Sequence, residues 1–203
     1  MVLLKSIRRA LSQARIGILI IAVTYLVSLS IGVLNVHTGN RFALSYGDSL
    51  VARAHLRDPA ARANDIGAHA TAALIDFSRN LGLAAAPETI GGLTLVLPVG
   101  LAAYRGWVGG IVSVDRKHQS RLRHWRSAIY YLVTLTLQLT AFTLAGGGGL
   151  NLGWSFIRKR GPFVGPTWFR LPKPALISVG WLYVLIVPLF ALGSLWEFFM
   201  PAV

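Results

Sequence analysis

Of the 203 residues of this chain, 54% are hydrophobic and only 13% are charged, against about 25% in typical globular chains, which excludes an ordinary soluble domain and indicates an integral membrane protein. Lys and Arg number 20 against 7 Asp and Glu, and because cytoplasmic loops of membrane proteins collect Lys and Arg, the net charge of +13 does not require a nucleic-acid partner. The sequence contains no Cys, which excludes disulfides, thiolate metal sites and Cys nucleophiles.

The N-terminal region combines a basic start with a long apolar run. In residues 1–15 the hydrophobic positions share one helical side and the basic positions occupy the rest, which predicts an amphipathic helix on the cytoplasmic membrane surface. Residues 16–34 are nearly all apolar, close to the roughly 20 residues that cross a hydrocarbon core. We expect the first membrane span there.

Residues 35–86 predict an outer amphipathic helical region. Asp58 followed by Pro59 is a favourable helix start, because Asp caps free N–H groups and Pro fits the first helical position. Polar side chains then recur at spacings of three and four residues, which places one polar stripe on one helix face: Arg62, Asp65, His69, Asp76 and Arg79. Such a helix either lies along the membrane surface or crosses the membrane with Asp76 and Arg79 shielded by protein.

Three further apolar runs complete the expected membrane domain. Residues 89–114 predict a span, and residues 127–157 predict a broken helix or a re-entrant hairpin, because the glycine run 146–149 interrupts an uncharged segment too long for one straight helix. Residues 174–200 predict the last span, in which Pro188 kinks the helix without ending it. The predicted fold is an all-α polytopic membrane protein of a single domain with about four to six membrane-embedded helical segments.

Three clusters of basic residues constrain the membrane topology. They lie in residues 1–15, 116–126 and 158–173. To place all three in the cytoplasm, residues 59–86 must not cross fully and residues 127–157 must cross an even number of times. Five simple spans are the competing arrangement, which exports the second cluster against the charge rule. Both arrangements put the N-terminus in the cytoplasm and the C-terminus outside, and we expect the bacterial cytoplasmic (inner) membrane.

Short motifs follow one another along the middle of the chain. They are Asp76-Phe77-Ser78-Arg79-Asn80-Leu81, Tyr104-Arg105-Gly106-Trp107-Val108-Gly109-Gly110, Leu137-Gln138-Leu139 and the Ala145 to Gly153 segment with its glycine run. Their order and spacing resemble the stage II sporulation protein M-like integral membrane proteins. In that family a Phe leads into an Asn-containing helical turn, a Tyr-Asn-Gly sequence ends the next span, and a His-Gly-x-x-Glu sequence precedes an Ala- and Gly-rich break.

The resemblance implies a non-enzymatic membrane scaffold that holds partner proteins, cell-wall-remodelling proteins among them. The chain departs from the family at its polar positions, since Arg105 stands where the family has Asn, and Thr134 and Gln138 stand where it has His and Glu. Asn151 stands where the family often has Arg. Ionised groups in hydrocarbon tend to mark function. Thr134, Gln138 and Asn151 are neutral where the family has ionisable side chains, and this predicts a hydrogen-bonded structural network.

The structural candidates come from these motifs: Asn80, Tyr104, Arg105, Gly106, Gly110, Thr134, Gln138, Gly146, Gly149, Asn151 and Gly153. Gln138 needs hydrogen-bond partners in the membrane, either Asn151 or a polar residue on another span, and predicts a clamp between helices. Arg105 lies near the end of its span beside aromatic residues, and we expect its long side chain to extend to the lipid phosphates.

Two pairs of glycines favour close helix contacts. Gly106 and Gly110 form one pair of small residues four apart, and Gly149 and Gly153 form another. The contact lies either within one chain or along the seam of a homodimer. Beyond a second copy, the expected partners are anionic lipid and other membrane or cell-envelope proteins.

No residue set points to catalysis, a metal or a cofactor. The seven acids are scattered, no two His have zinc spacing, and the His residues fall outside the clearly apolar spans. We therefore expect no enzymatic activity, and the family resemblance implies a scaffold. The alternatives are a permease-like transporter subunit with a path along the broken helix, and an accessory subunit of a pigment or redox complex that rests on His69 among small neighbours.

Overall fold

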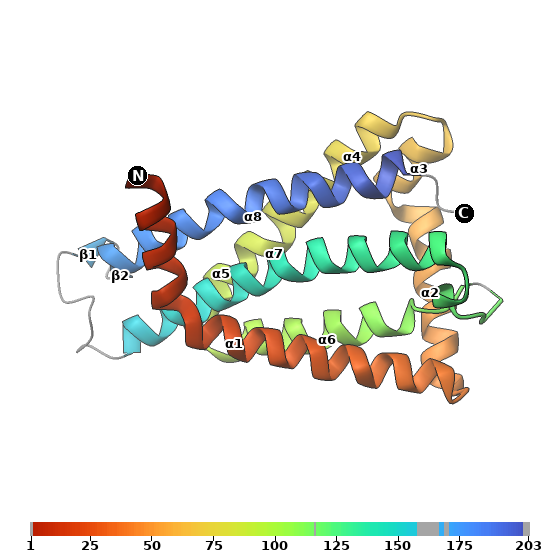
Figure 1. Cartoon of the computed structure of the whole chain (residues 1–203), viewed down its shortest axis with the longest axis horizontal. Helices are drawn as coiled ribbons and strands as arrows, with labels where there is room; N and C mark the ends of the chain where they lie inside the picture. The colour runs from red at the N-terminus through yellow and green to blue at the C-terminus, as the bar shows by residue number, and fades with distance from the viewer. Residues whose placement is uncertain (1, 116, 158–166, 169–170, 201–203) are drawn as a thin grey trace.

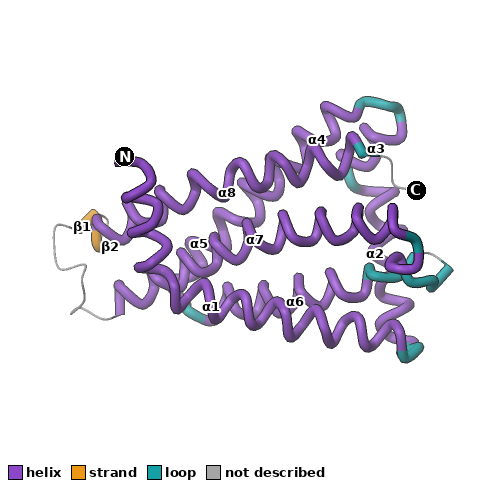
Figure 2. Tube along the Cα trace, viewed as in Figure 1, coloured by secondary structure: helices purple, strands orange, loops and turns teal. Residues whose placement is uncertain are grey.

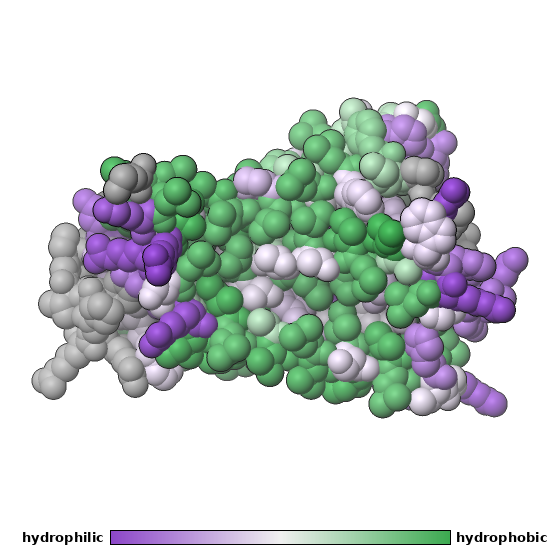
Figure 3. Space-filling model, viewed as in Figure 1, coloured by the Kyte–Doolittle hydropathy of each residue, from purple (hydrophilic) through white to green (hydrophobic). Residues whose placement is uncertain are grey.

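The computed structural model describes residues 2–115, 117–157, 167–168 and 171–200. Nearly all of this chain is helical, and the loops lie at the two ends of an elongated bundle (Figure 2). On the face drawn in Figure 3, apolar side chains form a broad band and hydrophilic side chains gather at both ends. This distribution matches a protein whose middle lies in hydrocarbon and whose ends meet water.

Three helices are long and apolar enough to cross a membrane: α1 (Val2–His37), α7 (Trp125–Ile157) and α8 (Lys173–Phe199). The chain is therefore an all-α membrane protein, as predicted. The remaining elements are α2 (Arg41–Arg57), α3 (Pro59–Asp65), α4 (His69–Ser78), the π-helix η1 (Arg79–Ala85), α5 (Ala86–Gly91), the 3₁₀ helix η2 (Gly92–Thr94), α6 (Val96–Ile111), the 3₁₀ helix η3 (Arg121–Arg123), β1 (Thr167–Trp168) and β2 (Leu171–Pro172).

The long helices run back and forth between the two ends of the bundle (Figure 1). α1 leads from the N-terminal end to the opposite end, where α2 runs across the bundle and α3 follows. We call α2 and α3 the platform. The chain returns through α4, η1 and α5, reverses into α6, returns through α7 and finishes in α8 at the platform end. α6 packs along α1, and α8 packs along α7 and α4.

The separate amphipathic start and first span expected from the sequence form one helix. α1 is continuous from Val2 to His37 and covers both residues 1–15 and residues 16–34. Its first turns run at an angle to the rest of the helix (Figure 1). Ala10 and Ala14 of this start are buried in the main core, so tertiary packing extends the helix beyond the apolar run.

The helix start at Asp58 is confirmed, but the polar stripe does not lie on one helix. The Asp58 side chain accepts a hydrogen bond from the Ala60 N–H at 2.9 Å and caps α3. α3 ends at Asp65, and the chain turns at Gly67, whose φ of +77° favours a residue without a Cβ. α4 then begins at His69 as a separate helix and enters the bundle.

The expected span over residues 89–114 is also corrected. The chain reverses at Leu95, which takes the left-handed conformation with φ +60°, so residues before it belong to α5 and η2 and residues after it to α6. Pro98 fits the first turn of α6, where the missing N–H costs no hydrogen bond. The two arms form a tight helical hairpin.

The glycine run does not break α7, contrary to the broken helix or hairpin expected over residues 127–157. α7 is one helix from Trp125 to Ile157. A Cβ on Gly147 would lie 2.6 Å from the backbone nitrogen of Ile18 in α1, and a Cβ on Gly148 would lie 2.9 Å from Leu182 Cδ1 in α8. These glycines therefore let α1 and α8 approach α7 closely, which is the role of small residues in membrane bundles.

The last span is confirmed. α8 continues through Pro188, because neighbouring helices keep it packed where the proline removes a backbone hydrogen bond. Its buried residues Leu182, Ile186 and Phe190 join the main hydrophobic core with Ile21 and Tyr25 of α1.

Candidate functional site

The hairpin of α5 and α6 brings a carboxylate and a guanidinium together inside the bundle. Glu88 lies in α5 and is 0% exposed. Because the chain reverses at Leu95, Arg105 of α6 reaches Glu88 and forms an ion pair with its Oε2 atom. A charge inside a membrane protein is costly unless it is paired, and such residues tend to mark function. The pair is therefore the first candidate for a functional centre.

Arg105 is also held by an aromatic ring. Its guanidinium carbon lies 3.9 Å from the centroid of the Phe142 ring in α7, a cation–π contact. Phe142 in turn meets Phe190 of α8 edge-on, with the ring centroids 4.8 Å apart. The expectation that Arg105 extends to the lipid phosphates is thus corrected, since Glu88 draws the guanidinium into the protein.

The other side of the Glu88 carboxylate faces α1 and α7. A Cβ on Gly146 would lie 2.7 Å from Glu88 Oε1, so the glycine makes room for this oxygen. Among the described residues, Glu88 Oε1 and the Tyr25 hydroxyl are buried without a hydrogen-bond partner. The neighbouring Thr89 hydroxyl bonds the Ala145 carbonyl at 3.1 Å and the Tyr183 hydroxyl at 2.9 Å. Residues of α1, α5, α7 and α8 thus supply polar atoms or closely packed backbone around this carboxylate.

A second polar cluster lies where α4, α7 and α8 meet. The Gln138 amide donates to Glu197 Oε2 at 3.0 Å. The Asp76 Oδ2 atom accepts from the Ser194 hydroxyl at 2.7 Å and from the Asn80 amide at 2.9 Å. Neither carboxylate has a Lys, Arg or His within ion-pair distance in the described part of the chain. Neutral donors from neighbouring helices satisfy them instead, as expected for polar groups removed from water.

A cavity of about 450 Å³ connects the two clusters. It lies between α6 and α7, and Arg105 and Phe142 line its inner part. Its other polar lining residues are Tyr104, Arg121, Tyr130, Tyr131, Thr134, Gln138 and Glu197. The cavity thus joins charged groups with tyrosine hydroxyls, which is typical of a binding site.

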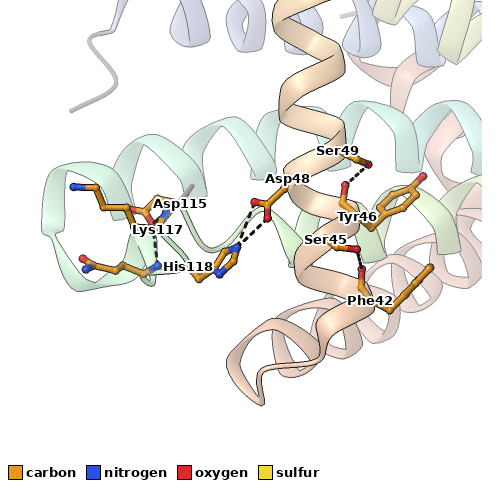
Figure 4. Close-up of polar contacts among 9 residues, drawn as sticks. Phe42, Ser45, Tyr46, Asp48, Ser49, Asp115, Lys117 and His118 are labelled. Carbon is orange, nitrogen blue, oxygen red and sulfur yellow. Dashed lines mark hydrogen bonds and ion pairs between the residues drawn. The ribbon is translucent and has the colours of Figure 1, made fainter.

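The platform is fixed to the bundle by side-chain contacts at its α2 helix. Asp48 accepts hydrogen bonds from His118 in the loop after α6, the shorter at 3.1 Å (Figure 4). The Tyr46 hydroxyl bonds the Tyr104 hydroxyl of α6 at 3.0 Å, and the Tyr46 ring lies 5.3 Å from the Trp107 ring, centroid to centroid. Side chains of α6 and of the loop after it therefore hold the platform against the bundle.

Asp115 orders the loop that meets the platform. Its Oδ1 atom accepts from the backbone N–H groups of Gln119 at 2.9 Å and Lys117 at 2.8 Å. These donors stabilise the carboxylate, and the bond from Gln119 is the main cause that lowers the pKa of Asp115 below its ordinary value. The turn places His118 at φ +57°, facing Asp48.

The structure places several of the predicted candidate residues in different parts of the bundle. Thr134 and Gln138 line the cavity, and the partner of Gln138 is a polar residue on another span, Glu197, which is one of the two predicted alternatives. Asn151 is not that partner. It lines a different cavity beside Trp154, and its amide nitrogen is buried without a hydrogen-bond partner among the described groups.

The glycine pairs lie at close contacts between helices of this one chain. A Cβ on Gly106 would lie 2.7 Å from the Tyr25 carbonyl oxygen of α1, and a Cβ on Gly149 would lie 2.7 Å from the Thr89 carbonyl oxygen of α5. Gly110 and Gly153 face backbone of α1 and η2 as closely. Helices of the same chain therefore pack against both pairs, which is the first of the two predicted arrangements.

The residues of the polar stripe have separate roles. Arg79 pairs with Asp58, the cap of α3, rather than with Asp76. His69 Nδ1 hydrogen-bonds Asn64 Oδ1 at 2.8 Å, and its ring lies 6.1 Å from the Phe199 ring, centroid to centroid. Arg62 and Asp65 stay on α3 in the platform.

Sequence reasoning missed Glu88, Glu197 and Tyr25. Glu88 is the only acid between Asp76 and Asp115, and this isolation in an apolar segment is the signal that identifies it. The described residues contain no group of three or more His, Cys, Asp or Glu that could hold a metal ion. No family model, curated protein or solved structure matches the chain.

Proposed function

We propose that this chain is a non-enzymatic integral membrane scaffold that holds other membrane or cell-envelope proteins, cell-wall-remodelling proteins among them. The platform is the observation that carries the proposal. Leu56 of α2 is 76% exposed, and Ile66, the residue that directly follows α3, is 82% exposed at the same end of the bundle. Large apolar side chains presented in this way are typical of surfaces that bind proteins.

The interior of the bundle supports the same role. The ion pair, the glutamine clamp and the glycine contacts join five helical segments within one chain. Polar and small residues inside membrane proteins hold helices together by hydrogen bonds and close packing. A bundle tied in this manner gives the platform a stable base.

The proposed location is the bacterial cytoplasmic membrane, with five crossings: α1, the α4-to-η2 arm, α6, α7 and α8. The N-terminal end carries four basic residues and no acid within residues 1–15, which favours its placement in the cytoplasm beside anionic lipid. The platform, the end of α8 and the basic cluster at 116–126 then lie outside, the last of these against the charge rule. The basic cluster at 158–173 falls mostly outside the described residues.

Isolation of the tagged protein from native membranes in mild detergent tests the scaffold proposal. We expect a membrane or cell-envelope protein to remain bound at a fixed molar ratio, because a platform that exposes apolar side chains needs a partner to cover them. Quantitative mass spectrometry of the eluate measures that ratio. A chain that emerges alone, or only with itself, contradicts the proposal.

A permease-like subunit is the second candidate, and the cavity favours it. The path follows the polar cavity between α6 and α7, since α7 has no break for a substrate to line. Charged residues in membrane-embedded cavities commonly mark solute or ion pathways. Arg105, which pairs with Glu88, lines this cavity.

Single-cysteine variants separate the two candidates, because the natural chain has no Cys. For a water-filled path, Thr134→Cys and Gln138→Cys are expected to react with a charged thiol reagent added outside intact cells. Ala141→Cys on the same helix is the matched control, since Ala141 is 0% exposed and does not line the cavity. Resistance of both cavity variants to the reagent, in protein that is still folded, would rule out the permease.

A further inference from the structure

The lining of the cavity carries one cation and one anion that the described residues do not pair. Arg105 is neutralised by Glu88. Arg121 donates from Nε to the Val114 carbonyl at 3.3 Å, and no acid among the described residues lies within ion-pair distance of it. Glu197 accepts from Gln138 and likewise has no described cation. The unpaired charges are therefore Arg121 and Glu197.

These two charges lie in the same part of the cavity. Both line it together with Tyr130, whose hydroxyl donates to the Glu197 backbone carbonyl oxygen at 3.0 Å. The Thr134 hydroxyl lines the cavity and is buried without a hydrogen-bond partner among the described groups. The site thus offers a guanidinium, a carboxylate and a further hydrogen-bonding group to one ligand.

The rest of the lining is long and divides into polar side chains, Arg105 among them, and apolar side chains. From Tyr130 to Phe142 the lining follows α7 over 12 helical steps, about 18 Å at the helical rise per residue. Its apolar lining consists of Val108, Val112, Leu135, Leu139 and Phe142. A ligand with a polar head and a hydrocarbon chain matches this division.

The charges decide between classes of headgroup. A purely anionic head would gain from Arg121 but would approach the Glu197 carboxylate, and a purely cationic head would gain from Glu197 but would approach Arg121. A head with both signs satisfies each group. An ammonium is also attracted by the faces of tyrosine rings, and a phosphate accepts two parallel hydrogen bonds from a guanidinium.

We propose that the cavity between α6 and α7 binds a zwitterionic head that carries an ammonium and a phosphate, as in phosphatidylethanolamine. The ammonium lies at Glu197, the phosphate at Arg121, and the hydrocarbon lies against the apolar lining. This binding site is independent of the scaffold proposal, because it does not involve the exposed side chains of the platform.

Binding to the purified full-length protein in detergent tests the site. The probes are short-chain phosphatidylethanolamine, short-chain phosphatidylglycerol and soluble phosphoethanolamine, with Kd measured by calorimetry. We expect phosphatidylethanolamine to bind at least about tenfold more tightly than phosphatidylglycerol, which is the effect of about 1.4 kcal/mol. Tight binding of phosphoethanolamine alone would support the site and identify a soluble zwitterion as its source.

Two variants test which side chain binds the ammonium and which binds the phosphate. Glu197→Gln should remove the preference for phosphatidylethanolamine, and Arg121→Gln should weaken both lipids. Arg123→Gln is the control, since Arg123 lies in the same short turn and does not line the cavity. Equal binding of the two lipids by the natural chain overturns the proposal, as does an unchanged preference in folded Glu197→Gln. If that variant does not fold, unchanged affinities in Arg121→Gln overturn it, because this residue lies in η3, outside the long helices.

Discussion

Replacement of Arg105 by Met is expected to lower the free energy of unfolding by about 3–5 kcal/mol. The variant keeps the long apolar stem but leaves the Glu88 carboxylate, which is 0% exposed, without its ion-pair partner. It also removes the cation that lies on the Phe142 ring. Unfolding in mixed detergent micelles, followed by circular dichroism, measures the loss.

A double-mutant cycle isolates the ion pair. Glu88→Gln alone leaves a guanidinium that cannot lose its proton, whereas the double variant Glu88→Gln/Arg105→Met leaves no charge. We expect the double variant to be more stable than the sum of the single losses by about 0.5–3 kcal/mol. Arg123→Met at an exposed position should change stability by less than about 0.5 kcal/mol. Additive losses would show that the two side chains do not interact.

Replacement of Gly110 by Ala should destabilise the bundle by about 1–3 kcal/mol. A Cβ at this position in α6 would lie 2.7 Å from the Val33 backbone nitrogen and 2.8 Å from the Gly32 Cα atom of α1. Backbone atoms cannot move aside as a flexible side chain does, so α1 and α6 must separate. The same micelle unfolding assay measures the change.

Gly100→Ala on the same helix is the matched control. Nothing lies within 4 Å of a Cβ there, so the substitution removes only the entropic cost of a helical glycine and should stabilise by about 0.5–1 kcal/mol. The two variants therefore change stability in opposite directions. Equal effects at both positions would contradict the close contact between α1 and α6.

The lengths of the apolar runs and the capping residues predicted the long helices. The positions at which helices end were predicted less well, because they depend on packing as well as on local sequence. The glycine run in α7 indicates a break by helix propensity, yet inside a membrane protein every backbone group must be bonded and small residues permit close packing. The reversal at Leu95 could not be predicted, because a leucine with positive φ has no local signature and exists only where tertiary packing holds it.

The candidate site was partly predictable. Gln138 was identified because an amide in an apolar run needs a partner, and Glu197 supplies it. The Glu88 pair with Arg105 was missed because the two residues are 17 positions apart and meet only through the hairpin. Recognition of each isolated acid in an apolar segment would have identified both Glu88 and Glu197.

Comparison of partner recovery between the natural chain and a platform variant tests the scaffold most directly. The variant Leu56→Ser/Ile66→Ser removes two exposed apolar side chains at this end of the bundle, and Leu4→Ser, at a position 74% exposed at the opposite end, is the control. After isolation from native membranes, the natural chain and the control should retain a partner at the same fixed ratio, and the platform variant should lose most of it. A partner retained equally by all three, or no partner in any, would contradict the scaffold.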